Sequence, residues 1–240
     1  MLLQNSLLEY NNSLERKLNL ENIMNLKQKL ARRIHNVLSN TELMTENMRS
    51  PKTIGLAWVA RTLMNYSNAQ VSIDIVNKMK IKKTDNVLEL GVGNGMAIKE
   101  IAKITGKEII GVEISAEFRR NLLKMKLSKN IVILENDAKD LSNEVHDESI
   151  DKLLAINVIY FLKPIQDYIL EFKRMLKKGG IGYLGCKFES IKNFDVEVAP
   201  NKSEGEIISQ LSKFGFNVSS EFVDLGEDRS RYTLIQFEKQ

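Results

Sequence analysis

The chain has 240 residues and a mass of 27.4 kDa, which suits one domain with a substantial hydrophobic core, or one domain and an extension. Apolar residues make up 43% of it and charged residues 28%, values near the globular average that exclude a disordered or collagen-like chain. The 35 Lys and Arg residues outnumber the 31 Asp and Glu residues, and a net charge of +4 neither requires nor excludes a nucleic-acid partner.

Cysteine and histidine are scarce, which limits the chemistry the chain can support. Cys186 is the one cysteine, so a disulfide within the chain and a multi-cysteine zinc site are excluded, and a reducing compartment is indicated. His35 and His146 are too few for a histidine-rich metal centre, and we expect no metal site. No apolar run approaches the roughly 20 residues that cross a bilayer, and the N-terminus lacks the pattern of a targeting peptide. A cytoplasmic protein without a membrane span is expected.

The N-terminal part of the chain has a helical pattern. Apolar residues recur at spacings near 3 and 4 over residues 14–38, which predicts an amphipathic helix, and helical spacing resumes from residue 50 to about residue 83. We therefore expect a helical N-terminal extension or cap, residues 1–70, and a main domain, residues 71–240. The N-terminal helix could pack on the main domain or contact a partner helix, and the oligomeric state stays open.

From residue 86 onward, short β-branched runs alternate with helical patterns. The predicted strands are 87–90, 109–112, 131–134, 153–156 and 181–184, and the predicted helices between them are 96–105, 116–127 and 165–177. A further helix, 204–214, precedes two strands, 216–223 and 231–238, whose short connection predicts antiparallel pairing at the sheet edge. This order predicts an α/β, doubly wound, mostly parallel seven-stranded sheet with an antiparallel C-terminal strand.

The string VLELGVGNG carries the most information about function. Its apolar strand runs into Gly91, Gly93 and Gly95, and glycines there permit a tight turn and a close approach of the backbone to a ligand. A dinucleotide-binding fingerprint expects Gly where Met96 stands, which disfavours a dehydrogenase. Glu89 precedes the first glycine by two residues, and an acid there suits a ligand with an amino group better than a pyrophosphate.

This string resembles the first motif of the class I methyltransferases that use S-adenosylmethionine, a family with a Rossmann-like fold. Matches to later motifs of that family follow in chain order over roughly residues 80–240. The resemblance implies that S-adenosylmethionine is the cofactor. It also implies a cofactor site formed by Glu89, Gly91, Gly93, Gly95, Glu113, Ile114, Asp137, Ala138 and Asn157.

Each residue type suits the role that the resemblance implies. Glu113 ends the second predicted strand, and a carboxylate can accept the protons of both ribose hydroxyls. Asp137 follows the third strand and would accept from the exocyclic amine of adenine, while the backbone N–H of Ala138 would reach the ring. Glu89 would face the methionine moiety. Asn157 ends the fourth strand and would face the reacting methyl group.

These motifs do not identify the acceptor, because one such scaffold hosts many substrates. We expect methyl transfer to an O, N or C nucleophile. In this family the sulfonium carries the reactivity and the protein aligns the nucleophile, so we assign no general base. His146 lies in a surface loop before the fourth strand and His35 in the N-terminal helix, and neither is expected to be catalytic.

A small-molecule acceptor is favoured over nucleic acid. Residues 157–160 invite comparison with the Asn-x-Pro-Tyr motif of enzymes that methylate the bases of nucleic acids, in which Pro helps to grip a flipped base. Ile159 replaces that Pro here, so the match is broken. No basic stripe interleaved with aromatic residues is present. Tyr160 and Phe161 could line the substrate pocket. Asn65 or Asn68 could reach the methionine carboxylate. A nucleic-acid or protein methyltransferase and a non-catalytic S-adenosylmethionine-binding module are the alternatives.

Overall fold

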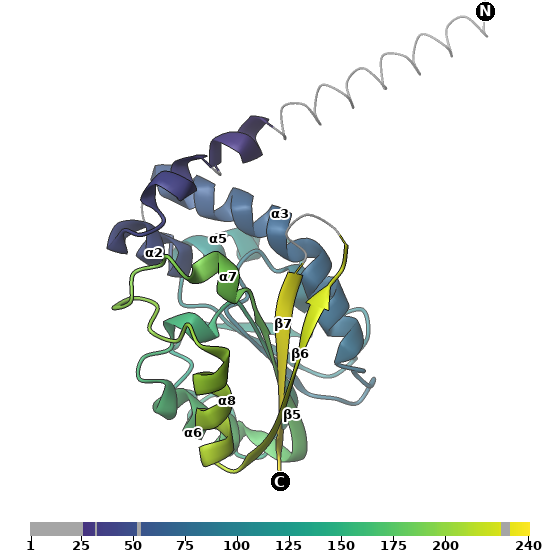
Figure 1. Ribbon diagram of the computed structural model, residues 1–240. Coiled ribbons are helices and arrows are strands. Elements are labelled where there is room, and N and C mark those ends of the chain that lie inside the picture. Colours follow the sequence, from purple (N-terminus) through teal and green to yellow (C-terminus); the bar gives the residue numbers. More distant parts are fainter. Residues whose placement is uncertain (1–25, 32, 52–53, 227–230) are drawn as a thin grey trace, which may run out of the picture.

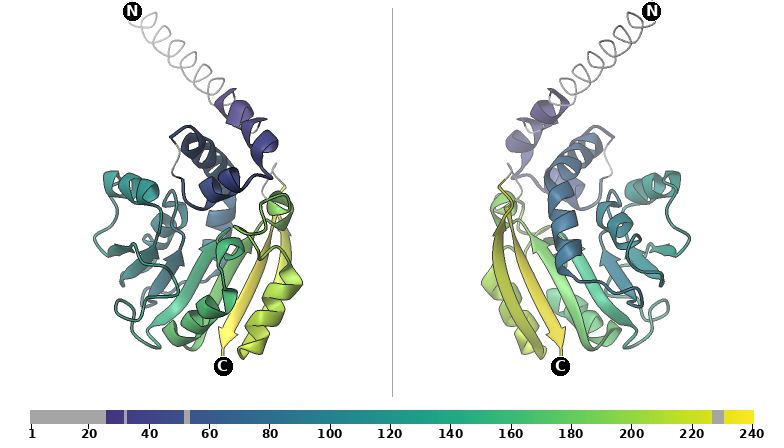
Figure 2. Two further views of the ribbon diagram at one scale, coloured as in Figure 1. Left: turned by 90° about the vertical axis from the view of Figure 1, so that its left-hand side faces the viewer. Right: turned by 90° about the vertical axis from the view of Figure 1, so that its right-hand side faces the viewer.

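A computed structural model describes residues 26–31, 33–51, 54–226 and 231–240. One twisted sheet forms the centre, helices cover both of its faces, and the N-terminal helices lie across one end of it (Figure 1, Figure 2). This arrangement is the doubly wound α/β fold that the alternation of strands and helices predicts.

The sheet contains seven strands in the order β3-β2-β1-β4-β5-β7-β6. β7 pairs antiparallel with β5 and β6, and the other neighbours pair parallel, which confirms the predicted sheet and the antiparallel pairing of its last two strands. The order reverses between β1 and β4, and in open α/β sheets ligands bind at the carboxyl ends of the strands beside such a switch point. The strands are β1 Val87–Leu90, β2 Ile109–Val112, β3 Ile131–Leu134, β4 Ile150–Ile156, β5 Leu176–Cys186, β6 Phe216–Asp224 and β7 Arg231–Lys239.

The helices of the main domain lie at the predicted positions but are trimmed at their ends. They are α4 Met96–Ile101, α5 Ala116–Lys124, α6 Ile165–Met175 and α8 Glu204–Lys213. α5 ends three residues early because Met125 is extended, with φ −81° and ψ 138°. The sequence does not predict η1 Ile159–Phe161 and α7 Phe188–Ile191, because a single turn is too short to show a helical period. No described helix has both the length and the apolar composition that a bilayer crossing needs.

β4 and β5 begin earlier than the sequence pattern predicts. β5 starts at Leu176, directly after α6, and Leu176 pairs with Ile150 before a shift in register. Gly179 lies just beyond this pair with φ 74°, a left-handed conformation that suits glycine. The extra pairing depends on contact between two strands, so the local pattern of either strand could not show it.

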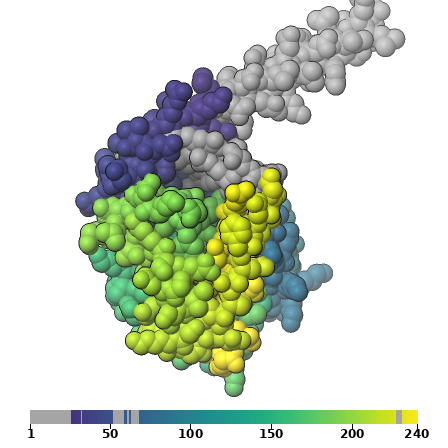
Figure 3. Space-filling model, in the orientation of Figure 1, coloured from purple at the N-terminus to yellow at the C-terminus, as the bar shows by residue number. Residues whose placement is uncertain are grey.

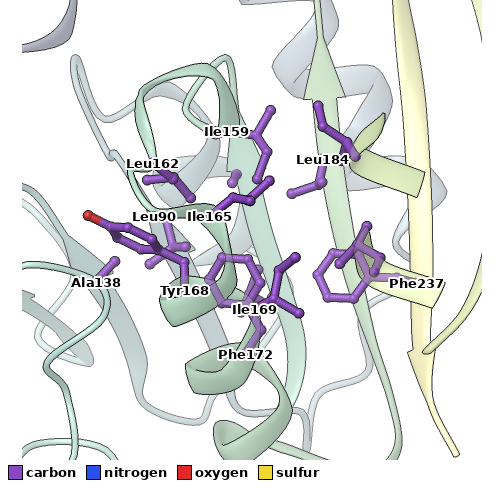
Figure 4. Packing of buried hydrophobic residues seen from close by; sticks show 14 of the residues in the cluster. Leu90, Ala138, Ile159, Leu162, Ile165, Tyr168, Ile169, Phe172, Leu184 and Phe237 are labelled. Carbon is purple, nitrogen blue, oxygen red and sulfur yellow. The ribbon is translucent and has the colours of Figure 1, made fainter. Parts of the chain in front are cut away.

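A hydrophobic core fills the space between one face of the sheet and helices α6 and α8 (Figure 4). Phe172 of α6 stacks on Phe237 of β7 with the ring centroids 5.9 Å apart, and burial of each ring contributes about 1.5–3 kcal/mol. Gly182 of β5 leaves room for the Phe237 ring, because a Cβ atom at Gly182 would lie 1.9 Å from it. The second core cluster, on the other face, joins α4 to α3 Ile54–Lys78.

The N-terminal segments form separate helices. Residues 26–31 and 33–38 are helical, which confirms the N-terminal helix there, and its earlier part lies outside the described residues. A turn follows, and α2 Glu42–Arg49 begins at the N-cap Thr41, whose Oγ1 accepts a hydrogen bond from the N–H of Met44 at 3.2 Å. The side-chain cap is a local signal for a new helix that the spacing of apolar residues does not carry.

The packing partner of α3 changes along its length. Near its start, Val59 is buried with Ala31 and Met44 in a small cluster of N-terminal segments. Further along, Val71 and Ile75 are fully buried in the core of the main domain. This change falls between residues 59 and 71, so one continuous helix joins the N-terminal segments to the sheet.

Candidate functional site

A cavity of about 190 Å³ opens at the carboxyl ends of β1, β2 and β4. Its described lining comes from the loops after these strands, the loops after β3 and β5, helices α5 and α6, and the N-terminal segments. A smaller cavity of about 30 Å³ adjoins it and shares Asn68, Gly91, Gly93 and Ile156 with it. The site therefore lies at the switch point of the sheet, where the fold predicts it.

Most of the predicted cofactor residues come together at these cavities. Glu89 lines the smaller cavity. Gly95 lines neither of the two; it is the N-cap of α4 with φ 72°, and a Cβ atom there would lie 2.8 Å from Cδ2 of Leu122, so its part is to shape the turn. The larger cavity is lined by Gly91, Gly93, Glu113, Ile114, Asp137, Ala138 and Asn157.

The first two glycines of the glycine loop, residues 91–95, have backbone conformations that favour glycine. Gly91 and Gly93 have φ values of 66° and 53°, in the left-handed region. A Cβ atom on Gly91 would lie 2.4 Å from Cγ2 of Val158. The N–H of Gly91 donates to the carbonyl oxygen of Val112 at 2.7 Å, which holds the loop against the end of β2. The backbone of the loop therefore lines the cavity directly.

Glu113 links the glycine loop to the loop after β2. Its Oε2 accepts the N–H of Gly93 at 2.8 Å and its Oε1 accepts the N–H of Ser115 at 2.7 Å. Burial raises the pKa of the Glu113 carboxyl group, and the two N–H donors oppose that rise. Each carboxylate oxygen has a second lone pair, so Glu113 can still accept hydrogen bonds from a ligand.

Glu89 is a buried carboxyl group that lacks a complete set of partners. Its side chain is 3% exposed, and its Oε2 has no hydrogen-bond partner among the described residues. Burial raises its pKa well above the usual value, and the charge of Glu113 adds to that rise. An unsatisfied buried carboxylate is unfavourable in the ligand-free protein, and a cationic ligand in the smaller cavity would satisfy it.

Asp137 is held by a residue that the sequence analysis did not select. The hydroxyl of Tyr168, on α6, hydrogen-bonds Asp137, and burial together with Asp137 raises the pKa of that phenol. Figure 4 shows the Tyr168 ring beside Ala138. Tyr168 follows Ile165 at core spacing on its helix, so its pattern indicates packing and gives no sign of the polar contact.

A chain of hydrogen bonds crosses the site through Asn157. This residue has φ 57°, which asparagine tolerates better than most residues. Its Nδ2 donates to Oδ1 of Asn68 on α3, and its Oδ1 accepts from the hydroxyl of Tyr160, each at 3.1 Å. That hydroxyl also accepts the backbone N–H of Lys187. The chain ties α3 to the ends of β4 and β5. The side chain of Asn65, the other candidate on α3, lies outside the described residues.

The far end of the larger cavity is aromatic. Phe161 stacks on Phe194 with the ring centroids 6.3 Å apart, and the His35 ring lies 6.0 Å from Phe194. Tyr160 and Phe161 line this cavity, and their contact with a substrate stays a prediction. His35 also lines the cavity, because the N-terminal helix carries it to the cavity wall.

Phe194 lines the cavity and His146 does not. Phe194 lies in an irregular segment after α7, so no periodic pattern marks it. His146 is not among the residues that line the cavity, in keeping with its surface loop. Within the described part of the chain, no group of three or more His, Cys, Asp or Glu side chains could hold a metal ion.

Comparison with known proteins assigns the domain. The family model described as "Methyltransferase domain" matches residues 88–184. A ribosomal RNA small subunit methyltransferase A of Caldanaerobacter subterraneus is 33% identical over 105 residues, 41% of this chain and 39% of that protein. Sterol methyltransferase-like 1 of Botryococcus braunii is 29% identical over 151 residues, 61% of this chain and 38% of that protein.

Solved structures share the fold at low identity. The Haloferax volcanii complex of the Trm112 methyltransferase activator with a methyltransferase matches with a TM-score of 0.66 and 18% identity, over 76% of this chain and 94% of that chain. Haemonchus contortus phosphoethanolamine N-methyltransferase 2 with S-adenosyl-L-methionine matches with a TM-score of 0.59 and 16% identity, over 71% of this chain and 52% of that chain.

The sheet order and the glycine loop at its switch point belong to a fold that this chain shares with solved methyltransferases. Residues 88–184, which hold β1 to most of β5, match the methyltransferase domain model. The chain spans about 38–44% of the length of the curated relatives it matches.

Proposed function

We propose that the protein transfers a methyl group from S-adenosylmethionine to an O, N or C atom of a small acceptor molecule. The observation that carries this proposal is that a single cavity joins the carboxylates beside the glycine loop to an aromatic end under the N-terminal cap. Two ligands that react must share one enclosed space, and this cavity provides it.

The residues around the two cavities suit the cofactor. The Oε2 of Glu89 in the smaller cavity, which has no hydrogen-bond partner in the described part of the chain, matches the ammonium of the methionine moiety. Glu113 has free lone pairs for the ribose hydroxyls. Asp137 and the backbone N–H of Ala138 would hold adenine, with Ile114 beside them. When bound, the cofactor supplies an electrophilic methyl group on a sulfonium.

The protein itself aligns the acceptor and excludes water. Asn157 faces the cavity in an orientation that Asn68 and Tyr160 fix by hydrogen bonds. The cap closes over the site: Oγ1 of Thr45 on α2 accepts the N–H of Asp195 at 3.0 Å, and in the space-filling view the purple N-terminal segment rests on the green segment around α7 (Figure 3). A closed, oriented site suits a reaction whose rate depends on placement of the nucleophile.

A nucleic-acid acceptor is the second candidate function. Two curated relatives are named as a ribosomal RNA and a tRNA methyltransferase. The small-molecule reading is favoured because the aromatic end of the cavity is walled by the cap, and because the relatives also include a protein named as a sterol methyltransferase and a solved phosphoethanolamine methyltransferase.

The proposal extends to the organisation and location of the chain. Residues 1–70 would act as the cap and residues 71–240 as the catalytic domain, which the change of packing partner along α3 supports. The cytoplasm is the proposed compartment, in keeping with the buried free thiol of Cys186.

Calorimetry with S-adenosylhomocysteine tests the cofactor assignment. We expect micromolar binding to the wild-type protein, on the order of −8 kcal/mol, and loss of that binding in Asp137→Ala. NAD serves as the control ligand and is expected not to bind. If S-adenosylhomocysteine fails to bind the folded wild-type protein, the proposed function is wrong. Transfer of label from methyl-labelled S-adenosylmethionine to the small-molecule, RNA and protein fractions of an extract then separates the acceptor classes.

A further inference from the structure

Two of the three basic residues that line the larger cavity lie apart from its acids. Among the described residues that line it, the acids are Glu113 and Asp137, at the ends of β2 and β3. The basic side chains are His35, Arg49 and Lys187, which come from the N-terminal segments and from the end of β5. The acidic part coincides with the proposed cofactor side, so the basic residues that lie away from that side face whatever occupies the rest of the cavity.

Arg49 belongs to the cofactor side of this division. Its guanidinium lies 3.4 Å from Glu46, and its charge acts on the Tyr168 phenol, which hydrogen-bonds Asp137. The basic groups at the aromatic end are therefore Lys187 and His35. His35 lies against Phe194, and Lys187 directly follows β5.

Lys187 is unusual for a lysine because it is only 8% exposed. Its backbone is fixed, since its N–H donates to the hydroxyl of Tyr160. A lysine charge in so dry a position interacts strongly with an anion that enters the same cavity, because little solvent screens it. Ser190, one helical turn along the chain, also lines the cavity and adds a hydroxyl donor.

The wall around these donors is apolar. Phe161 and Phe194 stack on each other, and Leu162 and Ile191 complete this part of the lining. Such a wall favours an apolar body, since its burial removes apolar surface from water. No described carboxylate lines this end of the cavity, so a cationic acceptor would find no acidic counter-charge among the residues described there.

We propose that the acceptor is a small amphipathic anion, with its apolar body between Phe161 and Phe194 and its carboxylate or phosphate group at Lys187. This inference rests on the proposed function, because it names the substrate class of the same site. An anionic group held at the end of β5 would fix the acceptor beside Asn157 at the end of β4, since the two strands are neighbours in the sheet.

The test measures binding of three matched probes to the full chain saturated with S-adenosylhomocysteine. The probes are 3-phenylpropionate, 3-phenylpropyl phosphate and the neutral 3-phenylpropanamide. We expect at least one anion to bind about tenfold or more tightly than the amide, because a charge-assisted contact in a desolvated site is worth that much. The better anion reveals whether the site prefers carboxylate or phosphate.

Variants then assign the preference to Lys187. Lys187→Met should weaken binding of the preferred anion about tenfold and leave the amide unchanged, whereas Lys187→Arg should keep the preference. Lys192→Met is the matched control, because Lys192 is exposed and paired with Glu189 at 2.6 Å. Calorimetric binding of S-adenosylhomocysteine to each variant verifies that it is folded.

Several results would overturn the inference. They are equal or tighter binding of the amide, no binding of either anion up to about 10 mM, and an unchanged anion preference in Lys187→Met. If these results accompany normal binding of S-adenosylhomocysteine, the acceptor class is wrong and the proposed function stands. If S-adenosylhomocysteine itself does not bind wild-type protein, the proposed function fails as well.

Discussion

Glu89 is a buried carboxyl group that also lines the smaller cavity. Its protonation state therefore affects both the stability of the fold and the binding of a ligand. In the folded, ligand-free protein its pKa lies above its usual value of 4.5, because burial disfavours the charged form and Glu113 repels it. The folded state therefore holds more protons than the unfolded state between pH 4.5 and the raised pKa. Stability must fall as pH rises through that window.

We expect Glu89→Gln to raise the unfolding free energy of the ligand-free protein at neutral pH by on the order of 1–2 kcal/mol, because the amide carries no charge to desolvate. The same variant should bind S-adenosylhomocysteine about tenfold more weakly, since its ammonium loses a charged partner. Melting temperatures with and without ligand, across the acid-to-neutral range, measure both effects. Glu100→Gln is the control, because Glu100 pairs with Lys103 at the surface. A lower melting temperature for Glu89→Gln at every pH would contradict this account.

Tyr160 is a positioning residue, and its hydroxyl can be removed without its ring. Tyr160→Phe leaves the backbone N–H of Lys187 and Oδ1 of Asn157 without that partner. We expect the unfolding free energy to fall by about 1–3 kcal/mol, with S-adenosylhomocysteine affinity changed less than about threefold. Chemical denaturation and calorimetry measure these. Tyr183→Phe is the matched control, because the Tyr183 hydroxyl has only a 3.5 Å contact with Lys152. An equal loss in both variants would argue against a special role for Tyr160.

The sequence could predict those site residues that come directly after a predicted strand. Glu113 and Asp137 follow short apolar runs, so strand pattern and chain order locate them, and the structure places both at the cavity. His35, Lys187 and Phe194 have no such marker. They reach the site only through the packing of the cap and of the loop after β5, which no local pattern encodes.

At the scale of elements, α2 is the part of the cap whose docking can be tested. The Oγ1 atom of Thr45 accepts the N–H of Asp195 and donates to the carbonyl oxygen of Thr41, each at 3.0 Å, and the side chain is fully buried. Thr45→Val keeps the shape but leaves a buried N–H without its acceptor. Local opening of α2 and of the segment around Asp195 should become easier by about 1–2 kcal/mol, roughly a 5- to 30-fold faster amide exchange.

Hydrogen exchange with peptide resolution measures this prediction. Exchange should rise in α2 and in the segment around Asp195, while β1 and β4 stay protected, because the core does not depend on this contact. Ser39→Ala is the control, since Ser39 lies in the same region but makes only a 3.5 Å contact with the carbonyl of Asn36. A uniform increase across the sheet would mean that α2 is part of the core and not a cap.

Elements were predictable to the extent that their pattern is local. β1, β2 and β3 lie where their β-branched runs predict, because each run is one strand between two turns. The early starts of β4 and β5 come from the pairing of Ile150 with Leu176, which needs the partner strand. α2 and α7 are short, so capping and tertiary contact define them more than period does.

At the scale of the whole molecule, the two parts of the site come from different strands of the sheet. The loops after β1, β2 and β3 supply the glycines and carboxylates, and the family match covers them. The aromatic and basic lining comes from the loops after β4 and β5 and from the N-terminal segments, much of it outside residues 88–184. This explains why the sequence identifies the cofactor class readily and the acceptor poorly.

The antiparallel edge of the sheet joins its parallel strands at the pairing of β5 with β7, and Gly182 tests that junction. A Cβ atom at Gly182 would lie 1.9 Å from the ring of Phe237, in a packed core with no room to yield. We expect Gly182→Ala to lower the global unfolding free energy by about 1–3 kcal/mol. Phe237→Leu in the same chain should recover part of the loss, because a smaller side chain relieves the clash. Denaturant unfolding of the single and double variants measures this coupling.

Gly205→Ala is the opposite control: nothing lies within 4 Å of a Cβ atom there, and alanine in helix α8 should stabilise the fold by up to about 1 kcal/mol. Purely additive effects of Gly182→Ala and Phe237→Leu would mean that the backbone, and not the ring, absorbs the added methyl group.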